Sequence, residues 1–105
     1  MGAAEIGRID EVIHGRLRLG VMVYLAEAEV ADFTELKTLL GATQGNLSVH
    51  LRKLQDAGYV TIEKSFLNLK PLTRIRITRS GRAAFAAYLE ALGNLVGRPE
   101  QDQAR

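Results

Sequence analysis

A chain of 105 residues, 47% of them hydrophobic and 25% charged, has the size and composition of one globular domain with a modest core. It contains no cysteine, which excludes disulfides, thiolate metal sites and a cysteine nucleophile. The net charge of +2 is unevenly spread. Residues 1–47 hold four Lys/Arg and seven Asp/Glu, residues 48–82 hold eight and two, and residues 83–105 hold two and three. Such a basic segment is typical of nucleic-acid binding, although a solvated basic face gives the same pattern.

The longest strongly apolar run, residues 19–26, is much too short to span a bilayer. The first residues lack a basic stretch followed by an apolar one, so no secretory signal is visible. We therefore expect a cytoplasmic protein that has no membrane partner.

Residues 1–9 are expected to form a flexible segment that precedes the domain, which we place at residues 10–96. A helical pattern begins at residue 10 and predicts a main helix over about residues 15–28. Gly15 and Gly20 each cost about 1 kcal/mol relative to alanine inside a helix. They either break the helix near Gly15 or allow another helix to come close, and the sequence leaves both open.

The next predicted helix spans residues 33–41, after a short connector over residues 29–31. Asp32 and Glu35 have the spacing of a capping box, and Gly41 ends the helix. Its leucines are expected to point inward: Leu36, Leu39 and Leu40.

After a tight turn, Thr43 can cap a helix over residues 43–57, and Gly58 suits its left-handed end. Leu47, Leu51 and Leu54 recur at four and three residues, so they share its core face. Two short helices joined by a brief turn predict a helix-turn-helix, in which the second is the recognition helix. Most amphipathic helices only meet water. The preceding helix and the basic segment that follows favour a role in the DNA major groove.

The outer face of this helix is polar and partly cationic. Gln44 and Asn46 can pair bidentately with adenine and Arg52 with guanine, and Gly45 would let the backbone approach DNA. The predicted DNA-binding residues of the recognition helix are Thr43, Gln44, Gly45, Asn46, Ser48, Val49, His50, Arg52 and Lys53.

His50 lies at the edge of the leucine stripe, where we expect a hydrogen bond to a backbone group or a phosphate. A zinc site is disfavoured because His14 is the only other histidine. Ser48 and His50 are two positions apart and diverge on a helix, so they cannot form a nucleophile–base pair. No glycine-rich phosphate loop or paired acidic motif occurs. We expect no enzyme activity, cofactor or metal.

After Gly58 the hydrophobic period changes from 3.6 to 2, over residues 59–64 and again over 74–78. Residues 65–73 are expected to form the exposed tip of a hairpin. Ile75 and Ile77 face the core, so the arginines between them face outward. This pattern predicts a basic two-stranded wing whose DNA-binding residues are Lys64, Lys70, Arg74 and Arg76. The hypothesis requires helix and wing to form one surface, with Arg52 and Arg76 on the same side of the molecule.

Thr78 can cap a last helix over residues 79–96, followed by a polar tail over residues 97–105. Apolar residues recur along this helix at three and four positions, a stripe long enough to pack against a second copy. We expect a homodimer whose interface comprises Val12, Ile13, Phe85, Tyr88, Leu89, Leu92, Leu95 and Val96.

The order helix, helix, recognition helix, wing, C-terminal helix resembles winged-helix transcriptional regulators of the MarR/ArsR type. Within them it is most similar to the small stand-alone winged helix DNA-binding domain group. The resemblance spans about residues 10–96, and its most specific part is 45–60, with Gly-Asn-Leu-Ser-x-His-Leu-x-Lys-Leu followed by Ala-Gly-Tyr-Val. Further matches are Lys70-Pro71-x-Thr73 and Ile77-Thr78-x-x-Gly81-Arg82.

The resemblance implies a winged helix-turn-helix of the α+β class, mostly α, that binds DNA. It also implies a dimer whose contacts come from the first and last helices. Two departures matter. The absence of cysteine does not support the metal sensing of many ArsR-type proteins, and the chain has no room for the helices that form the MarR-type ligand pocket. A small-molecule effector is therefore unknown.

Two hypotheses follow. The first is a sequence-specific regulator that binds double-stranded DNA as a homodimer, at an inverted-repeat operator with half-site centres about 34 Å apart or a multiple of it. The second is a winged-helix protein-interaction module without specific DNA binding, in which the apolar helix 79–96 carries the contact.

Overall fold

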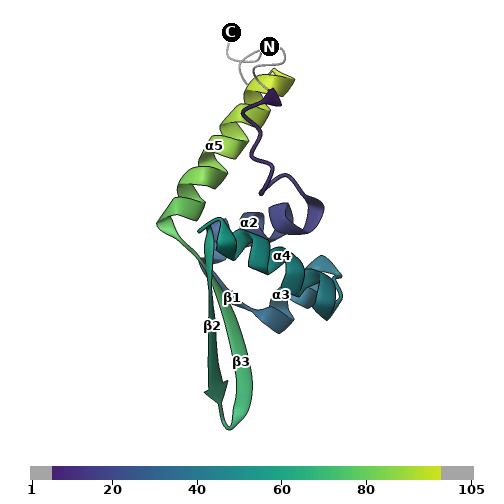
Figure 1. The fold of residues 1–105 in the computed structure, drawn as a ribbon, viewed down its shortest axis with the longest axis vertical. Helices are drawn as coiled ribbons and strands as arrows, with labels where there is room; N and C mark the ends of the chain where they lie inside the picture. Colours follow the sequence, from purple (N-terminus) through teal and green to yellow (C-terminus); the bar gives the residue numbers. More distant parts are fainter. Residues whose placement is uncertain (1–5, 98–105) are drawn as a thin grey trace.

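The computed structural model describes residues 6–97 (Figure 1). Most of the predicted flexible segment 1–9 and all of the predicted tail except Gly97 lie outside these residues. The elements run α2 (Arg16–Ala28), β1 (Val30–Asp32), α3 (Phe33–Leu40), α4 (Gln44–Asp56), β2 (Val60–Leu67), β3 (Lys70–Ile77) and α5 (Arg79–Val96). The predicted mostly helical winged fold is confirmed.

The structure explains both glycines near the first helix. Gly15 is extended, with φ of −152° and ψ of 141°, so α2 begins after it and the predicted break is confirmed. Gly20 faces α3: a Cβ there would lie 2.7 Å from Leu40 Cδ2. Each of the two alternatives left open by the sequence therefore holds at one glycine.

The capping box of α3 is present. Asp32 Oδ1 accepts a hydrogen bond from Glu35 N at 2.7 Å, and Glu35 Oε1 accepts one from Asp32 N. Leu36 is fully buried, but Leu39 is 57% exposed, so the inward orientation predicted for Leu39 is wrong. The reason is that α3 packs along a narrow stripe, in which Leu40 fills the space beside Gly20.

The predicted recognition helix is α4. Thr43 Oγ1 accepts a hydrogen bond from Asn46 N at 3.1 Å and so caps it. Leu47, Leu51 and Leu54 are buried in the core. The core lies between α2, α4 and the base of the sheet, and its fully buried side chains include Val21, Met22, Leu25, Leu36, Val60 and Ile75.

The sheet differs from the prediction in two respects. Strand β1 takes up residues 30 and 31 of the predicted connector 29–31 together with the capping residue Asp32. It pairs with β3 through Ala31 and Ile75 and gives the strand order β1-β3-β2. Three residues are too few to show a period of two, so only the pairing makes this segment a strand.

The hairpin is longer than predicted, and its loop is shorter. β2 and β3 have eight residues each and are joined by Asn68 and Leu69 alone, with φ of 53° and 69°. The predicted loop over residues 65–73 is therefore wrong. Outside the core neither face of a hairpin needs to be apolar, so alternation disappears while the backbone pairing continues.

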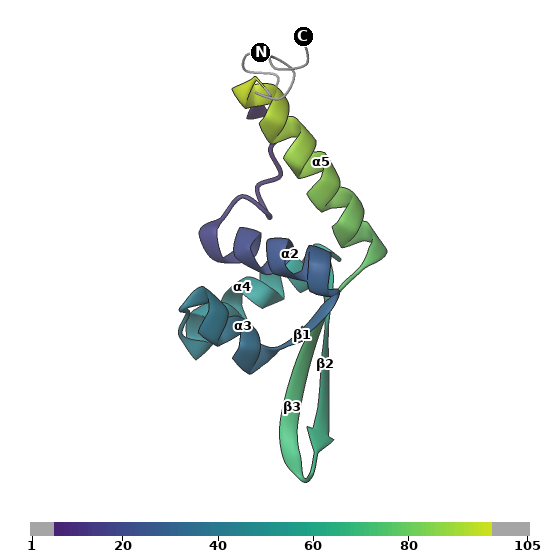
Figure 2. The ribbon, with the colours of Figure 1, turned by 180° about the vertical axis from the view of Figure 1, so that it is seen from behind.

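The hairpin and α5 project in different directions from the helical body, as both views show (Figures 1 and 2). The longest extent of the molecule is 57 Å, against 27 and 25 Å in the other directions. Within residues 6–97, no helix combines the length and hydropathy needed to cross a bilayer.

Candidate nucleic-acid interface

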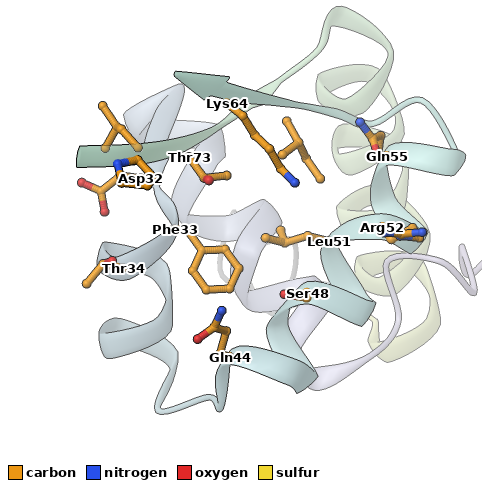
Figure 3. Close-up of a pocket in the computed structure, with 13 residues that line it drawn as sticks. Asp32, Phe33, Thr34, Gln44, Ser48, Leu51, Arg52, Gln55, Lys64 and Thr73 are labelled. Carbon is orange, nitrogen blue, oxygen red and sulfur yellow. The ribbon is translucent and has the colours of Figure 1, made fainter. Parts of the chain in front are cut away.

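A groove of about 650 Å³ lies between α4, the start of α3 and the hairpin (Figure 3). One wall is α4 and the other is the hairpin, with the first residues of α3 closing one end. The lining side chains are mostly polar and come from Asp32, Phe33, Thr34, Gln44, Ser48, Leu51, Arg52, Gln55, Ile62, Lys64, Pro71, Leu72 and Thr73.

Three predicted residues line the groove from α4. Gln44, Ser48 and Arg52 are four positions apart, so they share one edge of the helix, and all three are exposed. They lie along the groove in Figure 3. This edge provides an amide, a hydroxyl and a guanidinium, which are groups that hydrogen-bond to base edges.

The other predicted α4 residues lie outside this edge. Asn46, Val49 and Lys53 are exposed but do not line the groove. Gly45 is exposed, and a Cβ there would meet no atom within 4 Å. Thr43 is exposed, and its hydroxyl is engaged in capping the helix.

Strand alternation decides which wing residues face the groove. Ile62 and Lys64 lie on the face of the hairpin that is turned toward α4, opposite Ile75 and Thr73 in the pairing register. Figure 3 shows Lys64 and Thr73 pointing toward α4. Lys70 starts β3 at the tip and is exposed.

Arg74 and Arg76 project from the opposite face of the hairpin, because they alternate with Thr73 and Ile75. Arg76 also lies between two carboxylates, at 3.7 Å from Glu29 and 3.6 Å from Glu63. The expectation that Arg76 shares a surface with Arg52 is wrong. The joint surface instead takes its hairpin cation from Lys64, which the same alternation turns inward.

The remaining cations are not neutralised. Within residues 6–97, the two ion pairs are both made by Arg76, and Arg52, Lys53, Lys64, Lys70 and Arg74 are in none. These cations are therefore available to neutralise phosphate, and each phosphate contact releases condensed counterions.

His50 has a partner that was not predicted. The Arg18 guanidinium, which always carries protons, donates from Nη1 to His50 Nδ1 at 2.7 Å, so Nδ1 is the unprotonated nitrogen. Burial lowers the pKa of His50, and the positive charges of Arg18 and Lys53 lower it further. His50 thus joins α4 to α2: its Nδ1 binds a side chain and not the expected backbone group, while the phosphate contact stays a prediction.

Sequence reasoning missed several residues that hold this site. Arg18 also donates to the Val12 carbonyl, so one side chain ties α4 to the segment before α2. Tyr59, at the start of the hairpin, donates to Asp10 at 2.6 Å, and this hydrogen bond, with burial and the Asp10 charge, raises the pKa of Tyr59 to about 12. These pairs are 32 and 49 residues apart, and no local pattern marks them.

Nine of the 13 residues that line the groove were not predicted as site residues, and two of them are the aromatic ring of Phe33 and the amide of Gln55. Phe33 and Gln55 line the groove, from the first position of α3 and the last turn of α4. Gln55 lies seven residues after Ser48, which could have indicated a shared helical edge. The part of the chain described here holds no group of three His, Cys, Asp or Glu side chains placed to bind a metal ion.

The predicted dimer residues fall into two sets. Ile13, Phe85 and Tyr88 are buried in the core of the single chain, and Tyr88 Oη lies 2.9 Å from His14 Nδ1, so a dimer role for these three is wrong. They are buried because the segment before α2 packs against α5, where His14 contacts Tyr88. The other set keeps accessible surface: Leu89 and Val96 are exposed, and Val12, Leu92 and Leu95 are partly exposed.

Comparisons with known proteins agree with this geometry. The family model described as "Winged helix DNA-binding domain" matches residues 17–96. "Uncharacterized protein MJ0432" of Methanocaldococcus jannaschii is 35% identical over 79 residues, which are 75% of this chain and 86% of that protein.

Solved structures show the same fold. A transcriptional regulator homologue from Pyrococcus horikoshii OT3 has 28% identity and a TM-score of 0.84, over 90% of this chain and 95% of that one. The structure of overoxidized AbfR bound to DNA matches in fold, with 22% identity and a TM-score of 0.66, over 74% of this chain and 56% of AbfR.

Proposed function

This chain belongs to the winged helix DNA-binding domain family, and from that premise we propose that it regulates transcription by binding specific double-stranded DNA sites as a homodimer. The family and the fold are those of DNA-binding regulators and not of enzymes. The resemblance to winged-helix regulators of the MarR type is confirmed, since regulators of this type share the fold.

One observation carries the proposal. Gln44, Ser48 and Arg52 form a continuous exposed edge of α4, and the hairpin sets Lys64 across from them in the same groove. In this arrangement α4 lies in the major groove, with Arg52 and Gln44 on base edges, while Lys64 and Lys70 contact the backbone or the minor groove. Binding of DNA by the structural neighbour AbfR supports the choice of partner.

The homodimer is supported by α5. Leu89 and Val96 are seven residues apart, so they lie on one side of the helix, and they are 49% and 66% exposed. A second copy of α5 related by two-fold symmetry would cover them. The symmetry then predicts an inverted-repeat operator with half-site centres about 34 Å apart or a multiple of it.

Selection of oligonucleotides from a random pool tests specific binding. We expect enrichment of an inverted repeat, and mobility shifts on that repeat that survive excess unrelated DNA at physiological salt. If every duplex competes equally well, sequence-specific regulation is contradicted.

The dimer is tested by sedimentation with a matched pair of variants. We expect Leu89→Glu to give monomers, while Ala87→Glu, which adds the same charge to an exposed position on the other side of α5, keeps the dimer. A wild-type chain that is monomeric at micromolar concentration would remove the inverted-repeat prediction.

A second candidate function uses the same exposed stripe. If Leu89 and Val96 bind a different protein, the chain is an interaction module and its groove merely faces water. Competitor-resistant binding of the selected duplex decides against this alternative, because an interaction module has no sequence preference for DNA.

A further inference from the structure

The tip of the hairpin carries an apolar cluster that the contacts above do not use. Phe66 is 74% exposed, Leu67 57% and Leu69 95%. Single exposed apolar side chains are common on protein surfaces. Here Phe66 and Leu67 lie on opposite faces of the strand end and Leu69 lies in the turn beside them, so both faces of the tip are apolar, and exposed apolar surface of this kind marks interaction sites. We call these three residues the tip patch.

The backbone at the tip is unfavourable for the residue that occupies it. Leu69 has φ of 69°, in the left-handed region that two-residue hairpin turns normally fill with glycine or asparagine. Glycine would make this turn without strain and without placing a leucine in water. A residue that is both strained and almost fully exposed points to a function for its side chain.

The position of the tip identifies its partner. α5 lies at the other end of the molecule from the hairpin tip in both views, so a dimer formed through α5 leaves the tip patch uncovered (Figures 1 and 2). The tip is instead continuous with the groove, because Phe66 lies two residues beyond Lys64 on the same strand face. Lys70 follows Leu69 directly and is exposed.

Lysines on either side of an apolar tip match the chemistry of a minor groove. Phosphates line both edges of that groove and attract cations, while apolar side chains at its floor can enter between base steps and partly unstack them. Neither lysine is in an ion pair with residues 6–97, so both charges are available. A purely apolar protein partner would gain nothing from these charges.

We propose that Leu69 is a wedge that enters the minor groove next to the site of α4 and partly unstacks one base step. Lys64 and Lys70 hold the flanking phosphates, and the duplex bends away from the hairpin. This inference rests on the proposed function, since it requires a duplex in the groove. It adds a sequence preference at a step that no base-edge contact reads, because pyrimidine–purine steps unstack at the lowest cost.

The first test compares two exposed leucines on the duplex obtained by selection. We expect Leu69→Ala to weaken binding about tenfold, equivalent to about 1.4 kcal/mol. Leu39→Ala removes the same atoms from a leucine that is 57% exposed on α3 and does not line the groove, so its affinity should equal that of the wild type.

A glycine variant separates binding from folding. Leu69→Gly relieves the positive φ, so the melting temperature should rise by about 2–5 °C even though glycine makes the unfolded chain more flexible. Its affinity for the duplex should nevertheless fall at least as much as that of Leu69→Ala. Opposite signs for stability and binding cannot come from a loss of folded protein.

The unstacking itself is measured with 2-aminopurine placed at successive positions of the selected duplex. We expect the wild type to raise the fluorescence at one position per half-site, and Leu69→Ala to abolish that rise. If Leu69→Ala binds the duplex as the wild type does, with the same fluorescence, the wedge is wrong while the regulator proposal stands. If the wild type binds no duplex at all, both are wrong.

Discussion

The base of the β2–β3 hairpin belongs to the core, whereas its tip is exposed to solvent. The two ends differ in whether their cationic side chains form ion pairs. At the base, Arg76 lies between Glu29 and Glu63. Toward the tip, Lys64 has no ion pair within residues 6–97 and faces α4 across the groove. The difference teaches that a cation in a wing is available to DNA only where the fold leaves it without a carboxylate partner.

The most damaging way to break the base of the hairpin is to fill the space at Gly81. A Cβ there would lie 2.1 Å from the carbonyl oxygen of Tyr59, which is backbone and cannot move aside cheaply. We expect Gly81→Ala to lower the free energy of unfolding by about 3 kcal/mol, as for overpacked core sites. Urea denaturation measures this loss. An unchanged midpoint would mean that α5 can start elsewhere without cost.

The next effect concerns α4, where specificity is expected to lie rather than in the hairpin. Arg52→Ala should lose about 1–3 kcal/mol of binding energy on the selected site and relax the base preference at one position per half-site. Titration of a panel of single-base variants of the site measures both. An equal loss on all sequences would reassign Arg52 to a phosphate.

Gly45 differs from Gly81 in that the fold leaves space for a side chain. A Cβ at Gly45 meets nothing in the free chain, so Gly45→Ala should raise the free energy of unfolding by up to about 1 kcal/mol through helix propensity. If the backbone of α4 lies close to DNA at this point, the same methyl group should weaken duplex binding severalfold. Melting curves measure the change in stability of this variant, and duplex titrations of the same preparation measure its change in affinity. Unweakened binding would place Gly45 away from DNA.

The charge comparison is sharpened by two matched substitutions in the hairpin. Lys64→Ala should reduce the slope of log K against log salt by about 0.9, the value for one lost phosphate contact. Arg76→Ala should leave the slope unchanged and lower the free energy of unfolding by at most about 1 kcal/mol, since its ion pairs are partly exposed. A slope change in Arg76→Ala equal to that in Lys64→Ala would reverse the two assignments.

The smallest effect is the pH dependence of the Arg18–His50 hydrogen bond. Burial and two neighbouring cations lower the pKa of His50 from 6.5. As the pH falls, His50 is therefore protonated at a higher pH in the unfolded chain than in the folded chain. The contribution of neutral His50 to stability is therefore complete above about pH 6.5 and declines as the pH falls toward the lowered pKa.

This decline is tested by comparing melting temperatures at about pH 7.5 and pH 5.5. His50→Asn keeps an acceptor at the position of Nδ1, the atom that accepts from Arg18, but does not titrate. We expect the wild type to lose more stability than this variant between the two pH values. Equal losses would show that His50 does not contribute to the pH dependence.

Much of the fold could be predicted because its signals are local. The capping box of α3, the cap provided by Thr43 and the leucine stripe of α4 each depend on residues within one or two helical turns, and all three occur in the structure. The two strands of the hairpin, of which β3 carries the positive charge, were also recognised. The errors in strand assignment concern β1 and the length of the hairpin. Both occur where the strands are defined by backbone pairing and not by a side-chain pattern.

The candidate site was predicted less completely. Local periodicity placed Ser48 and Arg52 on the outer face of α4 and Gln44 on its flank, and all three side chains are exposed in the structure. It could not show that Arg76 is held by Glu29 or that His50 is held by Arg18, because these partners come from other parts of the chain. Local spacing carries no information about such pairs.

The amino-acid sequence by itself determined the order of the helices, their caps and the basic character of the hairpin, because periodicity, capping and charge act between residues close in the chain. Only the tertiary structure decided which cations are free. That choice depends on which strand face meets α4 and on which carboxylates the fold places beside each guanidinium.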